Sequence, residues 1–470
     1  MKERIILHID VNNAFLSWTA VNMLHNGSKI DIRNRYAVIG GDEATRHGIV
    51  LAKSMPAKRN GVKTAETLYS ARKKCPYLDV YPPEFKIYKK YSDRMYTYLC
   101  NYSNKIERYS IDECFLDYTD SYKLFGDPVK LAYKIKNEIR DNFGFTVNVG
   151  VGNNKLLAKM ASDFSKPDKV HTLFTAEVPS KMWPLNVDEL FMIGKASSKK
   201  LHDLGINTIG ELANTDPGLL TRHFKSMGKM MWEYANGIDN SEVESERGNP
   251  KSISTSVVLP YDYTDVDEIK KVLKELSMDT GKRLRNKKMY APNVSIWIKY
   301  HDFTKVSKQM TLDKLINSDM DIYNSACILF DKLYNPDGDK KVRSLCVGVA
   351  NLTNVYKVQL SLLDTNVKED EIDDELKKTL LEIKKKYGDK SITTADKINY
   401  IVDEGHYDFI ITIANDTPYA GLLALLNFSM NHKMIWIPHS TVKIHRVDSA
   451  IEGSEQFFND RLRWEEEAIS

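Results

Sequence analysis

Three acidic side chains stand at positions where an unpaired charge would be costly. Asp10 ends the apolar stretch "IILHID", and Asp112 and Glu113 are neighbours in "YSIDECFLDY", residues 109–118. The second segment is rich in β-forming residues and lacks Gly and Pro, which predicts a half-buried β-strand. Because burying a carboxylate without a partner costs free energy, these acids need compensation.

Divalent cations would supply that compensation. Adjacent side chains on a strand point to opposite faces, so Asp112 and Glu113 reach one site only if the strand twists at its end or a metal draws them together. Two Mg²⁺ ions about 3.5–4 Å apart take oxygen ligands and stabilise the attacking and leaving oxygens of a phosphoryl transfer. Asp10 would be the third carboxylate. A plainer interpretation also fits the spacing: Asp10 caps a helix starting near Asn12, and the adjacent pair faces solvent.

Length and composition favour a multidomain protein of the cytoplasm. A chain of 470 residues exceeds what one hydrophobic core usually serves. The five cysteines include no C-x-x-C pair, so neither a zinc knuckle nor a disulfide framework is indicated. The start of the chain lacks the features of a signal peptide, and the longest plainly apolar run, 420–426, is far shorter than a membrane-spanning helix. We therefore expect a cytoplasmic protein with no membrane partner.

Charge is divided unevenly along the chain. The formal net charge is +3, but basic residues outnumber acidic ones in residues 1–360, and the reverse holds in residues 361–470. A basic body that binds a polyanion would explain this division, and so would a solvated surface with an acidic tail. Charge alone favours neither interpretation.

Alternating α and β elements are predicted for the first part of the chain. "RIILHID" at 4–10 and "AVIGG" at 37–41 indicate strands. Residues 128–143 have apolar residues at helical spacing, and "FTVNVGVG" at 145–152 indicates a buried strand. Short helices separated by glycines at 185–235 then indicate a small helical domain.

A second, α+β unit is expected to begin near Ser252, after a polar linker. It contains the strand 252–259, a helix at about 265–285, and the strands 293–301 and 343–352. Beyond it lie a charged helical stretch at 368–388 and three strand-like segments, "YDFIITIAND", "KMIWIP" and "TVKIHRV".

Four sequence blocks resemble the Y-family, or translesion, DNA polymerases in the same order and at similar separations. They are "HIDVNNAFLSW" at 8–18, "GIVLAKSMPAKRNGVKTAE" at 48–66, "YSIDECFLDYT" at 109–119 and "VNVGVGNNKLLAKMASDFSKPDKV" at 147–170. The resemblance covers roughly residues 1–357. It implies a multidomain α/β and α+β fold, a right-hand polymerase with palm, fingers, small helical thumb and little finger.

The resemblance also implies where the domains begin and end. The expected bounds are 1–14 and 85–176 for the palm, 15–84 for the fingers, 177–243 for a helix-hairpin-helix-like thumb, 244–251 for a linker, 252–357 for the little finger, 358–367 for a clamp-binding peptide and 368–470 for a C-terminal extension of unknown role.

In that family the first aspartate and the acidic pair bind two metal ions, which implies catalytic and metal-binding roles for Asp10, Asp112 and Glu113. The backbone carbonyl of Val11 would be a further ligand of the two Mg²⁺ ions. A primer 3′-oxygen would then attack the α-phosphate of an incoming nucleotide and release pyrophosphate. Asp117 is interpreted as structural.

The resemblance implies three nucleotide-binding residues. Phe15 would be a steric gate whose ring fills the space of a ribose 2′-OH. Lys166 matches the phosphate-contacting lysine, and Lys58 stands where many members have an arginine, so it offers a point charge instead of a bidentate grip. Met55 replaces a common tyrosine. Lys159 could equally be a surface lysine.

DNA-binding residues are implied in two domains. The thumb segment "FMIGKASSKKLHDLGI" resembles a helix-hairpin-helix around Gly194, although Met192 stands where a second glycine is usual. In the little finger, "GKRLRNKK" supplies a run of basic residues that would follow the phosphate backbone: Lys282, Arg283, Arg285, Lys287 and Lys288. A solvated helix face is the alternative interpretation of this run.

A short peptide after the little finger resembles the one by which bacterial polymerases dock on the sliding clamp. Its candidate contact residues are Gln359, Leu360, Leu362 and Leu363, with Leu363 where Phe is usual.

Taken together, these patterns predict template-directed, error-prone translesion DNA synthesis for damage tolerance and repair. The expected partners are primer-template DNA, dNTPs and a sliding clamp, and the chain is expected to be a monomer. Two alternatives are a catalytically weak DNA- or clamp-binding accessory protein and a palm-type nucleotide cyclase. "GGDE" at 40–43 suggests the cyclase, but Ala44 follows where a cyclase has Phe. The eleven histidines show no metal-ligand spacing and receive no role.

Overall fold

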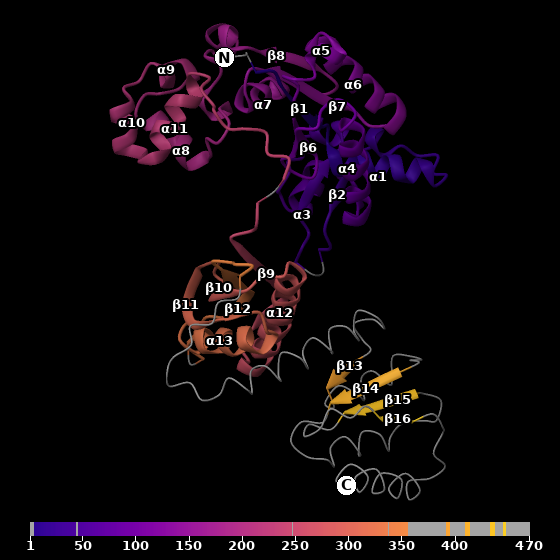
Figure 1. Ribbon diagram of the computed structural model, residues 1–470, viewed down its shortest axis with the longest axis vertical. Helices are drawn as coiled ribbons and strands as arrows, with labels where there is room; N and C mark the ends of the chain where they lie inside the picture. The colour runs from indigo at the N-terminus through magenta and orange to yellow at the C-terminus, as the bar shows by residue number, and fades with distance from the viewer. Residues whose placement is uncertain are drawn as a thin grey trace, which may run out of the picture. The chain divides into compact units, whose positions relative to one another are not determined.

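The computed structural model describes residues 4–43, 46–246, 248–336 and 338–355, together with four short backbone strands further along the chain. The chain divides into two compact units, Met1–Val358 and Gln359–Ser470 (Figure 1). None of the helices in the described ranges is both long enough and apolar enough to cross a membrane.

A five-stranded sheet forms the centre of the predicted palm (Figure 1). Its strand order is β5-β6-β1-β7-β8, and all neighbours are antiparallel except β7 and β8. The strands are β1 (Ile6–Val11), β5 (Ile106–Arg108), β6 (Glu113–Asp117), β7 (Val147–Gly152) and β8 (Val170–Leu173). The two central strands β1 and β7 are buried along their whole length.

Helices cover both faces of this sheet. Leu7, Ile9 and Val11 point into a core shared with α4 (Phe85–Leu99) and α6 (Pro128–Phe143). The alternate side chains of β1 face α7 (Lys155–Asp163), as expected from the two-residue period of a strand. Helix α7 lies so close to β7 that a Cβ at Gly150 would be 1.9 Å from the Ala158 carbonyl oxygen. A glycine is therefore required at that point.

The predicted fingers contain a three-stranded sheet in the order β3-β2-β4. Its elements are β2 (Ala37–Gly40), β3 (Val50–Lys53), β4 (Asp79–Tyr81), α1 (Ala14–His25), α2 (Met55–Arg59) and α3 (Leu68–Lys74). Helix α1 joins this region to the palm, because Trp18 and Val21 lie in the palm core while Leu16 and Ala20 pack against Ile39 of the fingers.

Four short helices form the predicted thumb: α8 (Lys195–Asp203), α9 (Ile209–Ala213), α10 (Pro217–Phe224) and α11 (Ser226–Ala235). Their core includes Leu156, Leu157 and Met160 of α7, so it is continuous with a helix of the palm. One further short helix of the palm is α5 (Tyr122–Phe125), and single helical turns occupy Ile32–Asn34, Thr175–Glu177, Val178–Met182 and Val187–Glu189.

The predicted little finger is an antiparallel sheet with two helices packed on one face (Figure 1). The strand order is β11-β10-β12-β9. The elements are β9 (Ser252–Tyr263), α12 (Val266–Asn286), β10 (Ala291–Tyr300), β11 (Lys305–Ile316), α13 (Asp319–Asp331) and β12 (Val342–Ala350).

The segment between thumb and little finger makes specific contacts with the palm before it reaches β9. Val243 is buried against Ile6 and Phe115, and the backbone N–H of Glu244 donates to Glu107 Oε2 over 2.9 Å. The first part of the predicted linker is therefore fixed to the palm sheet.

Beyond residue 358 the structure describes only the backbones of β13 (Ile392–Thr394), β14 (Phe409–Ile413), β15 (Lys433–Ile437) and β16 (His445–Val447). They form one sheet in this order, parallel except for β15 and β16. The three predicted C-terminal strand segments are confirmed. The predicted helix at 368–388 and the clamp-binding peptide lie outside the described residues.

Candidate active site

Asp10 and Glu113 lie opposite each other on neighbouring strands. The register of β1 pairs Asp10 with Glu113 on β6 and with Asn148 on β7. Directly opposite residues of an antiparallel pair project from the same face of the sheet. Since Ile9 and Val11 turn into the palm core, the shared face is the one that α7 covers. Two carboxylates thus stand side by side at the end of the sheet, where they need a cation.

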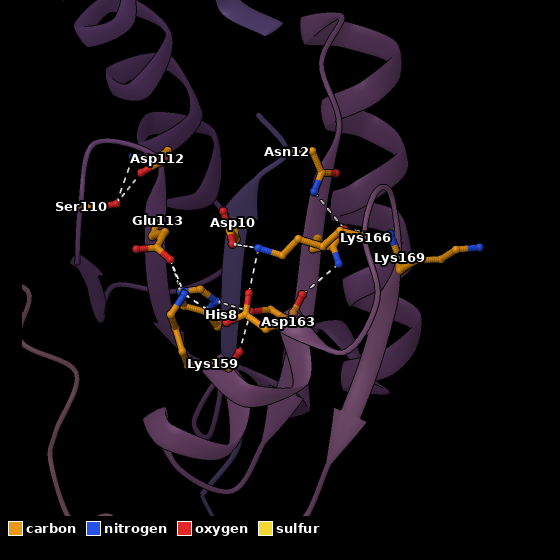
Figure 2. A network of polar contacts seen from close by, with 12 residues as sticks. His8, Asp10, Asn12, Ser110, Asp112, Glu113, Lys159, Asp163, Lys166 and Lys169 are labelled. Carbon is orange, nitrogen blue, oxygen red and sulfur yellow. Dashed lines mark hydrogen bonds and ion pairs between the residues drawn. The ribbon is translucent and has the colours of Figure 1, made fainter. Parts of the chain in front are cut away.

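Asp112 lies outside the strand, which corrects the prediction of a strand over 109–118. Strand β6 begins at Glu113, and residues 110–112 form a bend. The Ser110 hydroxyl donates to Asp112 Oδ1 over 2.6 Å, and the Asp112 carbonyl accepts from the Val11 N–H over 3.1 Å. The bend frees Asp112 from the alternation of the strand, so all three carboxylates lie at one end of the sheet (Figure 2).

Two lysines neutralise the opposed carboxylates (Figure 2). Lys159 on α7 pairs with Glu113, and Lys166, in the turn after α7, pairs with Asp10. Asp163 contacts both, at 3.5 Å from Lys159 Nζ and 2.8 Å from Lys166 Nζ. Lys159 is only 9% exposed, so the alternative of a surface lysine is wrong.

Burial and charge shift the titration of this cluster. Burial raises the pKa of Asp10 to about 6, although the Lys166 ammonium acts in the opposite direction. Burial also acts to lower the pKa of Lys166, but the negative charges of Asp10 and Asp163 outweigh it and raise that pKa to about 12. Lys166 is therefore charged at neutral pH. A carboxylate as desolvated as Asp10 is held in its charged form by nearby positive charge.

His8, to which the sequence analysis assigned no role, lies beneath the carboxylates (Figure 2). Its Nδ1 lies 2.8 Å from the hydroxyl oxygen of Ser162, whose own proton goes to the Lys159 carbonyl. The proton between the first pair must therefore sit on His8 Nδ1, which leaves Nε2 as a bare acceptor 3.8 Å from Glu113 Oε1. Burial, reinforced by Lys159 and Lys166, lowers the pKa of His8 well below its usual value, so the ring is neutral.

The donor set of this site suits hard divalent cations. Within residues 4–355, apart from the few undescribed positions, no three acidic, His or Cys side chains close around a single point. Asp10, Asp112, Glu113 and the Val11 carbonyl nevertheless offer oxygen ligands, the type that Mg²⁺ prefers. The ammonium groups of Lys159 and Lys166 lie against two of these carboxylates. The residues present thus fit a cation site.

Phe15 is half-buried at the start of α1, close to the end of β1. Its ring stacks on Tyr88 with a centroid separation of 4.5 Å and an interplanar angle of 10°, and meets Phe85 edge-on at 5.9 Å. Tyr88 is fully buried and lies 3.1 Å, hydroxyl to hydroxyl, from Thr19. The ring of the predicted gate residue, Phe15, is thus held in place by the rings of Tyr88 and Phe85.

Lys58 and Met55 both lie on α2 of the fingers, where their side chains are exposed. The helix is capped by Ser54, whose hydroxyl oxygen accepts from the Ala57 N–H over 3.1 Å. Among the described residues, Lys58 makes no hydrogen bond or ion pair with the three carboxylates. Its role in nucleotide binding stays a prediction.

The thumb hairpin retains a glycine-like backbone at Met192. This residue has a φ of 73°, in the left-handed region, and its side chain is exposed. Gly194 is the N-cap of α8, and its carbonyl accepts from the N–H groups of Ser197 and Ser198 at 2.9 Å. Met192 therefore adopts the left-handed backbone conformation that a glycine at this position would favour.

The basic run of α12 divides into two groups. Arg285 pairs with Asp319 over 2.6 Å, and Arg283 donates to the Ser254 carbonyl over 2.6 Å, so both also hold the domain together. Lys287 and Lys288 are exposed at the end of the helix. The DNA-binding roles of this run, including Lys282, stay predictions.

Comparison with known proteins identifies the family. Residues 9–163 match the model of the impB/mucB/samB family, and residues 250–362 match its C-terminal domain. A DNA polymerase IV from Clostridium acetobutylicum is 48% identical over 389 residues, which cover 83% of this chain and 97% of that protein. The chain belongs to the Y family of DNA polymerases. It is therefore a DNA-directed DNA polymerase, and membership of this family implies dependence on a divalent metal ion.

Other relatives of this Y-family polymerase agree in sequence and fold. DNA polymerase IV 1 of Bacillus subtilis is 34% identical over 392 residues, covering 83% of this chain and 92% of that protein. Among solved structures, a Y-family DNA polymerase chimera of Dbh and Dpo4 matches with a TM-score of 0.65 and 26% identity, over 74% of this chain and 98% of the chimera. An insertion ternary complex of Dbh DNA polymerase matches with a TM-score of 0.53 and 25% identity, over 74% and 98%. The predicted right-hand fold is confirmed.

The sequence analysis assigned no role to His8 or Asn148, and it did not predict that Lys159 is buried. Each lies on the face of the sheet that carries Asp10 or on the helix above it. Strand alternation was a usable signal for His8, because it stands two residues before Asp10 and so shares its face.

Proposed function

We propose that this polymerase carries out template-directed, error-prone translesion synthesis through two Mg²⁺ ions in the cytoplasm, as part of DNA damage tolerance and repair. The observation that carries the proposal is the placement of Asp10 opposite Glu113, with Asp112 freed by the bend beside them. Three carboxylates at one sheet end, partly neutralised by lysines, have the charge and the ligand type for a two-metal site.

Each side chain has a distinct task in this proposal. Asp10, Asp112, Glu113 and the Val11 carbonyl would hold the ions, which when bound stabilise the charge that develops on the attacking and leaving oxygens. Lys166 would contact the triphosphate, because its side chain is 39% exposed while its ammonium lies beside Asp10. Phe15 would select deoxynucleotides, because its ring is held by Tyr88 and would fill the space that a ribose 2′-OH needs.

Primer-template DNA would be held by the thumb hairpin around Gly194 and by the little finger. One face of the little-finger sheet points away from α12 and α13; we call it the open sheet face. Its exposed or half-buried residues include Ser252, Ser254, Ser256, Asn293, Ser295, Trp297, Lys299, Lys305, Ser307, Gln309 and Thr311. Its serines, amides and two lysines can contact a backbone without reading its sequence.

The test of this function is primer extension with dNTPs and Mg²⁺ on an intact template and on one with an abasic site. We expect extension past the lesion and its loss in Asp112→Ala, by about 10³-fold, since metal stabilisation is worth several kcal/mol. Asp117→Asn is the matched control, because Asp117 stands at the end of β6 opposite to Glu113 and its carboxylate accepts from the Thr119 N–H. Bound but unextended primer-template in the wild type would favour the accessory-protein alternative.

We further propose that a monomeric chain binds a sliding clamp through Gln359, Leu360, Leu362 and Leu363. Replacing these four residues with alanine should abolish clamp binding while distributive synthesis continues. Clamp binding that survives the replacement would place the contact elsewhere in the chain.

A further inference from the structure

Asn148 uses every hydrogen-bonding position of its side chain. Its Nδ2 donates to the carbonyl oxygens of Ser162 at 2.9 Å and Ser165 at 2.6 Å. Its Oδ1 accepts from Asn12 Nδ2 at 3.1 Å and from the Lys169 N–H at 3.3 Å. A primary amide has two donor hydrogens and two lone pairs, so the group is saturated. Asn148 is fully buried, and none of these contacts can be replaced by water without cost.

Asn12 extends the same network to the other side of the turn. Its Oδ1 accepts from the Asp168 N–H over 2.9 Å, and it is only 7% exposed. Asp168 has a φ of 59°, and its carboxylate accepts from the buried ammonium of Lys136 over 2.9 Å. The turn of residues 165–169 is thus fixed at positions 165, 168 and 169 by buried side chains.

Lys166 lies between these fixed points. Its own polar contacts are with Asp10 and Asp163, both through the ammonium group. Asn148 stands directly opposite Asp10 in the register of β1 and β7. One row of the sheet therefore carries both the carboxylate and the amide that fixes the turn facing it.

We propose that Asn148 and Asn12 are positioning residues for nucleotide binding, whose amides clamp the 165–169 turn and so set where the Lys166 ammonium lies. The inference rests on the proposed function, in which Lys166 contacts the triphosphate. Displacing a binding group by about 1 Å can cost on the order of 10²-fold in rate. We therefore expect the two asparagines to affect KM for dNTP and not Kd for primer-template.

Asn148→Asp tests the clamp, because a carboxylate of nearly the same shape cannot donate to the carbonyls of Ser162 and Ser165. We expect KM for dNTP to rise about tenfold or more, with a smaller change in kcat and an unchanged Kd for primer-template. Asn154→Asp is the matched control. Asn154 is a buried asparagine at the other end of α7, and its Nδ2 donates to the Gly237 carbonyl over 2.8 Å. It should lower Tm but leave KM within about twofold.

The double variant with Lys166→Ala separates the possible outcomes. If Asn148 acts through Lys166, Asn148→Asp should change KM by less than about threefold in the Lys166→Ala background. If the two substitutions instead change KM by independent factors that multiply, the positioning role of Asn148 would be contradicted. A raised KM in Lys166→Ala beside a normal KM in Asn148→Asp would also overturn it, while leaving the proposed function intact. A normal KM in Lys166→Ala would remove the nucleotide role of Lys166 itself and the clamp with it. If Asn148→Asp does not fold, Asn12→Ala removes the bond to Asp168 and is judged by the same outcomes.

Discussion

The palm and the little finger each carry a sheet with helices packed on one face, but they differ on the other face. In the palm that face carries Asp10 and Glu113, which are covered by α7 and paired with lysines. In the little finger the open sheet face carries mostly serines and amides that are exposed or half-buried. Placing charge accurately for chemistry requires a buried, cross-linked surface, whereas a DNA backbone of any sequence can be contacted from an accessible surface of basic and polar side chains.

Glu113→Gln, in the palm, should have the largest effect on activity. The amide keeps the shape but removes the charge that we propose binds metal, and it removes the ion pair with Lys159. We expect kcat to fall by about 10³-fold with little change in primer-template affinity, measured by single-turnover extension and by fluorescence anisotropy. An equal loss of primer-template affinity would contradict the idea that the palm carboxylates act in catalysis and not in DNA binding.

Phe15→Ala should affect the choice of sugar without ending synthesis. Removing the ring opens the space of a 2′-OH, so the preference for dNTP over rNTP should fall by about 10- to 100-fold in kcat/KM. Tyr91→Phe is a suitable control, because Tyr91 is an aromatic residue of the same core whose ring stacks on Trp18. An unchanged sugar preference in Phe15→Ala would rule out the gate.

Lys287→Ala combined with Lys288→Ala tests the little-finger side. Both lysines are exposed, so their loss should weaken DNA binding several-fold for all sequences and reduce the slope of log K against log salt by about 1 for each lost phosphate contact. Arg285→Ala should instead mainly lower Tm, because that arginine pairs with Asp319. The reverse pattern would assign DNA contact to Arg285 and leave the two lysines solvated.

Met192→Gly should give the smallest effect. Left-handed backbone costs a non-glycine residue about 1–2 kcal/mol, and the extra chain entropy of glycine offsets about 0.5–1 kcal/mol. The free energy of unfolding should therefore rise by about 0.5 kcal/mol, measured by urea denaturation. Met227→Gly, inside helix α11, should lower it by about 1 kcal/mol. A loss of stability in Met192→Gly would show that the methionine side chain stabilises the turn.

Much of the fold could be predicted because local signals agreed with tertiary structure. The helix predicted over 128–143 is α6 with the same bounds, where Pro128 begins it and Gly144 follows it. The helix predicted at 265–285 is α12, Val266–Asn286. Strand β11 was missed, because as an edge strand it exposes charged residues such as Lys308 and Lys314, and this obscures the alternation.

The site was predictable only as far as family motifs and strand ends reveal it. Position and residue type singled out Asp10, Asp112 and Glu113, and the family resemblance assigned their role; the structure brings them to one end of the sheet. The ion pair of Lys159 with Glu113 could not be read from the sequence, because it depends on how α7 packs over the sheet. The exact start of β6 was also hidden, since Tyr109 and Ile111 favour strands although Ser110 and Asp112 beside them form a bend.

Strand β1 has a consequence for how this enzyme can change over evolutionary time. It is paired on both edges, and His8 and Asp10 lie on the site's face while Leu7, Ile9 and Val11 fill the core on the other. Deleting a single codon before Asp10 would turn the carboxylate toward α4 and α6 if pairing were kept, because a one-residue slip exchanges the faces of a strand. A point substitution in β1 changes one side chain and leaves the others in place. A change in the length of β1 alters both the face that carries Asp10 and the face that packs in the core. Natural variation in β1 should therefore consist of substitutions, with insertions and deletions confined to the loops that flank it.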